Sequence, residues 1–344
     1  MLKINTYELE SGMVLADDVV SIRTGVILIP KGTILNKKSI RKIYNRGIKF
    51  VYIYDKDDIS NNLEKDKLEI KYEILSDKLD NVFTDVKIGK KIILTEINDE
   101  IDDLIDEIID NNNILAIIRE LEEKDDYTFN HSLNVSMLTT MLGKWLGYSQ
   151  KKIKQLTIAG LFHDIGKLKI DENIINKPGK LTDIEFEEIK KHTIYGYNIL
   201  KETVGISKNV SLAVLQHHER EDGSGYPLGL KKNEIHEYAK IIAICDTYDA
   251  MTSNRVYKPK KSPFFAAEIL RDEGFNILNP KMTKIFLDKI AGFYVGCTVL
   301  LSNGEEGDII YIHPQAPTKA IVKLGDEFID FLKPQDLEIV DIIK

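Results

Sequence analysis

Hydrophobic residues change their spacing along the chain and divide it into four segments. Residues 1–56 combine short β-rich runs with one short helix, which we expect over residues 37–46 and which Gly47 ends. In residues 57–125, hydrophobic residues recur at helical spacing among many charged ones. This pattern predicts a small β-rich N-terminal module followed by a helical connector.

The third segment is a succession of helices with apolar faces near helical period. Three of the expected helices cover residues 131–146, 153–163 and 234–253. Thr182 or Asp183 is the expected N-cap of a further helix, which holds His192. Ser207 is expected to begin the helix that delivers His217, and a last helix begins at Ser262-Pro263.

From residue 294 onward the period changes again. Gly, Asn and Pro separate short runs at residues 295–301, 308–312, 319–324 and 328–332. These runs predict a small antiparallel sheet or barrel over residues 294–344. The expected fold is therefore multidomain and mainly α, with an all-helical domain over residues 126–293. A small N-terminal α+β domain and a small C-terminal β domain flank it.

Composition narrows the class of protein. The chain has 344 residues, of which 43% are hydrophobic and 30% charged, as in soluble globular proteins. No apolar run approaches the roughly 18 residues of a membrane span, and the N-terminus lacks the apolar core of a signal peptide. Two cysteines suit a reducing compartment. We therefore expect a cytoplasmic protein without a membrane anchor.

The charge balance bears on possible partners. A net charge of −8 argues against general binding to DNA or RNA, although a small anionic ligand remains compatible with local cations. The helical connector includes a strongly acidic stretch at residues 96–110. Its apolar face either packs on a neighbouring element or dimerises. Residues 1–125 are thus the expected site of a homodimer contact or a signalling partner.

The candidate chemistry lies in the helical domain. Five of the seven histidines fall in this one segment, at positions 131, 163, 192, 217 and 218. Asp164 directly follows one of them, and Asp246 lies further along. A lone His-Asp pair beside apolar residues is more often a core pair, but five histidines on consecutive helices are unlike chance scatter. Because a carboxylate has two oxygens, Asp164 can bridge two ions. The set predicts a two-metal centre.

The order of these motifs resembles the HD superfamily of metal phosphohydrolases. The stretch His217-His218-Glu219-Arg220-Glu221-Asp222-Gly223-Ser224-Gly225-Tyr226-Pro227 is similar to the defining motif of its HD-GYP family. The run Tyr248-Asp249-Ala250-Met251-Thr252-Ser253, followed by Arg255, Tyr257 and Lys258, also matches that family's pattern. The resemblance covers about residues 125–293.

The resemblance implies an HD-type domain that hydrolyses cyclic di-GMP to pGpG, and often on to GMP, with a hydroxide bound at a two-metal centre. Iron is the metal it implies first and manganese second, with Asp164 bridging the ions. Mixed imidazole and carboxylate ligation suits these metals or zinc better than Mg or Ca. By position, the implied ligands are His131, His163, Asp164, His192, His217, His218 and Asp246.

Further roles follow from the same resemblance. Lys167 would sit beside the metals as a catalytic residue together with Asp164, and we expect substrate contacts from Arg255, Lys258, Tyr226 and Asp249. Glu219 is either a partner that orients His217 or His218, or exposed. Some family members place a glutamate ligand for a third metal four residues before the first histidine. Here that position is Tyr127, so we predict two metals.

Two other functions remain open from the sequence. One is a phosphodiesterase for another cyclic dinucleotide such as cyclic GMP-AMP, because recognition of guanine against adenine depends on pocket geometry. The other is a receptor that binds the dinucleotide without turnover. The filled ligand set and Lys167 argue against the receptor.

Overall fold

We describe the fold from a computed structural model of the chain. The structure describes residues 2–10, 13–20, 27–31, 33, 35, 37–54, 56–110, 130–253, 261–272, 274, 277–334 and 336–343. Contacts divide the chain into two compact units, Met1–Lys67 and Leu68–Lys344. No helix in the described ranges is both long and apolar enough to span a bilayer.

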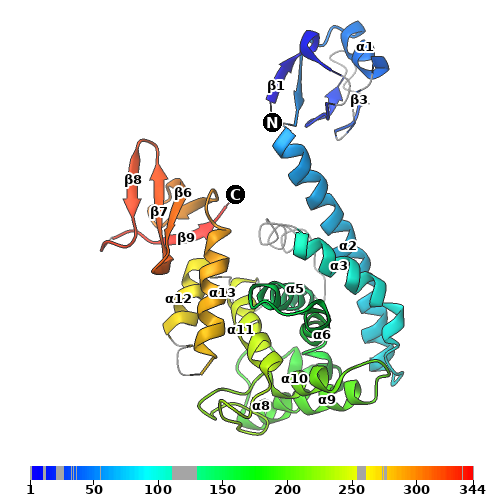
Figure 1. The fold of residues 1–344 in the computed structure, drawn as a ribbon, viewed down its shortest axis with the longest axis vertical. Helices are drawn as coiled ribbons and strands as arrows, with labels where there is room; N and C mark the ends of the chain where they lie inside the picture. The colour runs from blue at the N-terminus through cyan, green and yellow to red at the C-terminus, as the bar shows by residue number, and fades with distance from the viewer. Residues whose placement is uncertain are drawn as a thin grey trace. The chain divides into compact units, whose positions relative to one another are not determined.

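In its described residues, the first unit contains two small antiparallel sheets, a short 3-10 helix and an α-helix, and it extends into the long helix that follows (Figure 1). Its elements are β1 (Leu2–Asn5), η1 (Thr6–Glu8), β2 (Val19–Val20), β3 (Ile27–Ile29), α1 (Lys37–Asn45) and β4 (Phe50–Ile53). Strand β1 pairs with β4, and β2 pairs with β3. Helix α1 ends before Gly47, whose φ of 69° is the left-handed conformation that glycine tolerates best. The expected helix over residues 37–46 is thereby confirmed.

Helices α2 (Lys56–Lys87) and α3 (Asn98–Asp110) flank the short turn η2 (Leu94–Glu96) and correspond to the two helical series of the connector. Two ion pairs join the helices, Lys71 to Glu107 at 2.9 Å and Lys78 to Glu100 at 2.5 Å. Their apolar side chains from Tyr72 onward are buried in the core of the second unit. This burial favours packing within the chain over a dimer seam. Ile74, which we expected on the apolar face, is instead 46% exposed.

The central part of the second unit is all helical (Figure 1). Its helices are α5 (Asn130–Trp145), α6 (Gln150–Leu161), η3 (Ile165–Lys169), α7 (Glu172–Ile175), α8 (Asp183–Lys190), α9 (His192–Lys201), α10 (Lys208–Gln216), α11 (Glu237–Thr252), α12 (Pro263–Asp272) and α13 (Pro280–Gly292). Thr182 is an N-cap with a full capping box, as expected, but the helix it caps ends at Lys190. His192 begins a separate helix, so the single helix expected there was wrong.

The C-terminal strands form one antiparallel sheet in the order β8-β7-β6-β5-β9. They are β5 (Thr298–Leu301), β6 (Glu306–His313), β7 (Ala316–Leu324), β8 (Glu327–Asp330) and β9 (Ile339–Ile342). The expected small sheet is confirmed, although β9 was not expected. Its inward side chains, including Val299, Val322 and Ile342, belong to the same hydrophobic core as Phe286 of α13.

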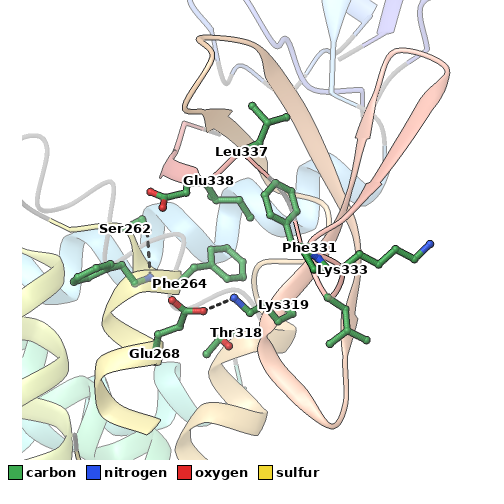
Figure 2. Close-up of a pocket in the computed structure, with 13 residues that line it drawn as sticks. Ser262, Phe264, Glu268, Thr318, Lys319, Phe331, Lys333, Leu337 and Glu338 are labelled. Atoms are coloured by element: carbon green, nitrogen blue, oxygen red, sulfur yellow. Dashed lines mark hydrogen bonds and ion pairs between the residues drawn. The ribbon is translucent and has the colours of Figure 1, made fainter. Parts of the chain in front are cut away.

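A pocket of about 500 Å³ lies between α12 and the sheet (Figure 2). Phe264, Phe331 and Leu337 supply apolar surface to it. Lys319 of β7 forms an ion pair with Glu268 of α12 at 2.5 Å. This pair and the shared core fasten the sheet to the helical part of the unit.

Candidate metal centre

The predicted ligands come from five helical elements and the turns at their ends. His131 is the second residue of α5, and Asp246 lies within α11. His163 and Asp164 occupy the turn between α6 and η3, while His192 is the first residue of α9. His217 and His218 follow the last residue of α10. Helix ends free the backbone to turn, and this lets neighbouring side chains converge on one point.

Three of the histidines share one local geometry. In each, Nδ1 lies 2.7 Å from the carbonyl oxygen three residues earlier. The pairs are His163 with Gly160, His192 with Ile189, and His217 with Val214. A carbonyl oxygen only accepts, so Nδ1 must donate, and in the neutral ring Nε2 keeps its lone pair. The local backbone thus sets three imidazoles in the tautomer that binds metal through Nε2.

These nitrogen atoms converge on the carboxylate of Asp164. Nε2 of His163 lies 3.4 Å from Oδ2, and Nε2 of His192 lies 3.4 Å from Oδ1. Nε2 of His192 is also 3.4 Å from Nε2 of His217. On the other side, Nε2 of His131 is 3.7 Å from Oδ2 of Asp164 and 3.2 Å from Oδ1 of Asp246. The structure therefore brings the predicted ligands together.

The ligand atoms form two groups that share one residue. One group is Asp164, His192, His217 and His218, and the other is His131, His163 and Asp164. Within each group all ligand atoms lie within 4.8 Å of one another. Because Asp164 belongs to both and has two oxygens, the arrangement could hold two ions that share one carboxylate.

Two buried atoms test whether this set fits metal ions. Nε2 of His163 and Oδ1 of Asp164 are buried and have no hydrogen-bond partner in the described part of the chain. A buried polar atom without a partner costs about 1–3 kcal/mol, so such atoms are rare in folded proteins. Both are donors of lone pairs that point into the cluster. Divalent ions would satisfy them, and imidazole with carboxylate is a typical ligand set for transition metals.

Burial and neighbouring charges set the protonation states of Asp164, His217 and His218. Burial alone would raise the pKa of Asp164, but Lys167 and His163 outweigh it and hold that pKa well below the usual range. Burial lowers the pKa of His218 to about 3, so this ring is neutral near pH 7. Burial also keeps the pKa of His217 low. An ionised carboxylate beside neutral imidazoles is the state that binds metal.

Lys167 lies beside the cluster, as expected. Its Nζ is 2.5 Å from Oδ2 of Asp164, and the side chain is 41% exposed. A pocket of about 410 Å³ opens here, and its lining includes Lys167, His131, Asp246 and Arg220. The ammonium group is thus available to an anionic ligand that enters the pocket.

Asp249 does not lie where we expected it. The side chain is 2% exposed, and its Oδ2 lies 2.6 Å from Nδ1 of His131. Burial would lower the pKa of His131, but the carboxylates of Asp246 and Asp249 outweigh it and raise that pKa to about 9. We therefore assign Asp249 to the orientation of His131 and withdraw it as a substrate contact.

Tyr226 lies against the predicted ligand His218. Its ring is 4.7 Å from that of His218, with 29° between the planes. Glu219, in the same motif, neither orients a histidine nor is exposed. Its carboxylate accepts hydrogen bonds from the backbone N–H of Leu228 at 2.7 Å and of Leu230 at 2.8 Å. Glu219 therefore holds the loop that carries Tyr226.

The structure does not describe every residue that was predicted for the site. Three positions lie outside the described residues. Two of them are the expected substrate contacts Arg255 and Lys258. The third is Tyr127, which occupies the position where some family members have a glutamate ligand for a third metal. Sequence reasoning missed Arg220 as a residue of the pocket lining. Its place two residues after His218, within the same motif, was the available signal.

Comparison with known proteins agrees with this geometry. Residues 114–281 match the HD domain family. The fold also resembles the structure of Bd1817, an HDG"Y"P protein from Bdellovibrio bacteriovorus, with a TM-score of 0.55 at 18% identity. That match covers 84% of this chain and 99% of the other. Fold and sequence together define a protein with an HD domain, and the candidate metal ligands lie within the matched residues.

Several proteins of known name are similar to this chain in sequence. The chain is 34% identical over 246 residues to a cyclic di-GMP phosphodiesterase of Pseudomonas aeruginosa, covering 71% of this chain and 59% of that protein. It is 36% identical over 176 residues to a cyclic di-GMP phosphodiesterase of Thermotoga maritima, covering 51% and 48%. Over 153 residues it is 40% identical to a 3'3'-cGAMP-specific phosphodiesterase of Vibrio cholerae, covering 44% and 35%. The chain carries an HD domain, and it spans between 35% and 59% of the length of these relatives.

Proposed function

We propose that this protein is a metal-dependent phosphodiesterase that hydrolyses cyclic di-GMP to pGpG; whether it continues to GMP is an outcome of the turnover assay. The observation that carries the proposal is the pair of ligand groups that share Asp164 beside an open pocket. Relatives named as cyclic di-GMP phosphodiesterases support the substrate. We place the activity in residues 126–293, in the cytoplasm, with no role for DNA, RNA or a membrane.

The proposed centre holds two divalent ions, iron first and manganese second. Its proposed ligands are His131, His163, Asp164, His192, His217, His218 and Asp246. When bound, two such ions neutralise a phosphodiester and lower the pKa of water. The absence of a glutamate at position 127 supports two ions over three.

The side chains around the proposed metal centre would bind the substrate and orient the ligands. Lys167 would bring a compact positive charge to the scissile phosphate while it keeps Asp164 ionised. Asp249 would hold the ring of His131 in one orientation. Tyr226 would border the pocket for a base, and Arg255 and Lys258 would hold ligand phosphate.

A second substrate is favoured by one comparison. The relative from Vibrio cholerae is named as specific for 3'3'-cGAMP and is 40% identical over the part it shares with this chain. Cyclic GMP-AMP presents the same phosphodiester chemistry, and only its adenine differs from the guanine of cyclic di-GMP. It is therefore the alternative substrate. Residues 1–125 are the proposed region of contact with a second copy or a signalling partner.

The test is purification without oxygen, metal analysis, and turnover of both dinucleotides by the full chain. We expect about two metal ions per chain and release of pGpG, and the same assay measures any GMP. His192→Gln should lose metal and activity, whereas His313→Gln is the matched control, because His313 pairs with Asp330 of the sheet at 2.9 Å. Full metal occupancy with no product from either dinucleotide would refute the hydrolytic function and favour a receptor.

A further inference from the structure

Arg220 is the cation in the pocket lining that the proposed chemistry has not used. It lies two residues after His218 and lines the same pocket as Lys167, Asp164 and Asp246. Lys167 also faces this pocket, and its ammonium group pairs with Asp164. Within the described residues, the guanidinium of Arg220 forms no ion pair, and it is half-buried. A partly buried arginine usually has an anionic partner, because burial of a charge without one is costly.

The acidic residues next to Arg220 are all engaged elsewhere. Glu219 accepts from the backbone of the following loop. Oε1 of Glu221 accepts a hydrogen bond from Nδ2 of Asn279 at 2.8 Å and forms an ion pair with Nζ of Lys240 at 3.0 Å. Asp222 accepts from the backbone N–H and the hydroxyl of Ser224. Among the described residues, none of these carboxylates forms an ion pair with Arg220, although the charge of the arginine helps to lower the pKa of Asp222.

The backbone holds this arginine in a defined place. Nη1 donates to the carbonyl of Glu219 at 3.1 Å and lies 3.4 Å from that of His217. The carbonyl of Arg220 accepts from the N–H of Gly223 at 2.8 Å. Gly225 packs so tightly on this segment that a Cβ on it would lie 2.3 Å from the amide nitrogen of Arg220. The remaining N–H groups of the planar fork are thus presented in a fixed arrangement suited to phosphate oxygens.

We propose that Arg220 binds a phosphate group of the substrate within the metal-centre pocket. This assignment rests on the proposed phosphodiesterase function and adds a substrate-binding residue to it. A contact to phosphate, rather than to a base, would contribute equally to cyclic di-GMP and to cyclic GMP-AMP, because the two share the same phosphodiester backbone.

The test compares Arg220→Gln and Arg220→Lys with the wild-type full chain. Loss of charge-assisted hydrogen bonds predicts a rise in KM of about 10- to 100-fold for both dinucleotides in Arg220→Gln. Arg220→Lys should recover part of the loss, because it restores the charge but not the fork. Metal content should stay at the wild-type level in both variants. Arg271→Gln is the matched control, because Arg271 pairs with Asp272 outside the pocket.

Two further probes separate this proposal from the function on which it rests. Bis(p-nitrophenyl) phosphate is a phosphodiester without bases, and Arg220→Gln should lose activity on it as well. If the wild type cleaves this compound but neither dinucleotide, the proposed function fails while the role of Arg220 stands. Titration calorimetry with inorganic phosphate compares the phosphate affinity of the metal-loaded wild type and Arg220→Gln without turnover. Wild-type KM and phosphate affinity in Arg220→Gln, or a loss confined to one dinucleotide, would overturn the phosphate contact.

Discussion

Asp249 and His131 form a buried pair in which Oδ2 of the aspartate lies 2.6 Å from Nδ1 of the imidazole. The other ring nitrogen, Nε2, lies 3.2 Å from Asp246. Asp246 and Asp249 are three residues apart on α11, so both reach the same ring from one helix face. One helix therefore provides a proposed ligand and the group that orients another.

Asp249→Asn is expected to weaken metal binding by about 10- to 100-fold, because partners that orient a ligating histidine typically contribute that much. The amide can still accept from Nδ1, but it lacks the charge that raises the basicity of the ring. The measurement is metal affinity by titration into metal-free protein. Ser253→Ala is the control, because it removes a hydroxyl that donates to Oδ1 of Asp249 at 3.0 Å and leaves the bond to His131. Equal affinity in Asp249→Asn and wild type would contradict this role.

Glu219→Ala should loosen the loop that carries Tyr226. The change leaves the N–H groups of Leu228 and Leu230 without their acceptor, at a cost of about 2 kcal/mol in the free energy of unfolding. We also expect a several-fold rise in KM, since Tyr226 stacks against His218, which lines the pocket. Urea unfolding and steady-state kinetics measure the two effects.

The matched variant for this loop is Glu219→Gln. Its single carbonyl oxygen can serve one of the two N–H groups, so its effect should fall between those of wild type and Glu219→Ala. Wild-type stability and KM in Glu219→Ala would show that the loop does not depend on this carboxylate.

Much of the site followed from the sequence because its chemistry needs rare residues. Histidines are few in this chain, and five of them share one helical segment. The turn geometry of His163, His192 and His217 is also local, since each ring bonds a carbonyl three residues earlier. What the spacing could not show was which side chains face the pocket and which face the core. Asp249 and Glu219 are examples: both are buried, and their carboxylates bind the ring of His131 and the backbone of the loop, respectively.

The sequence predicted the short elements of the fold less completely than the long ones. The break between α8 and α9 escaped prediction because Lys191 keeps helical dihedrals, with φ −67° and ψ −13°, and the polarity does not change there. Strand β9 has four residues, Ile339–Ile342, with an aspartate among them, which is too little alternation to recognise. Its pairing with β5 comes from tertiary contact.

Gly166→Ala is expected to disturb the centre through packing alone. A Cβ on Gly166 would lie 1.8 Å from the carbonyl oxygen of His192 and 2.5 Å from the amide nitrogen of Gly196. The backbone of α9 must move away, and this carries His192 from Asp164. Overpacking of this kind costs about 2–3 kcal/mol, and urea unfolding measures it.

Gly292→Ala is the control for this substitution, because a Cβ there meets nothing within 4 Å. It should leave both stability and metal content unchanged or improve stability slightly. If Gly166→Ala matches Gly292→Ala in unfolding midpoint and metal content, then the close approach of η3 to α9 is not needed to position His192.

His236 should make the stability of α11 depend on pH. Its side chain caps the helix by accepting from the N–H of Tyr238 at 3.2 Å, and only a neutral ring nitrogen can accept. Burial lowers the pKa of His236 below its ordinary value of 6.5, while Glu237 opposes the shift. As pH falls through about 6.5 the unfolded chain binds the proton more readily, so the contribution of the cap is present above this pH and lost below it. His236→Ser caps without titrating in this range. We therefore expect similar stability near about pH 7.5 and a relative gain in stability for the variant near about pH 5.5. Urea unfolding of both proteins at the two pH values measures the difference, in which the shared titration of the other histidines cancels. An identical pH dependence in the two proteins would show that the cap does not titrate as the structure implies.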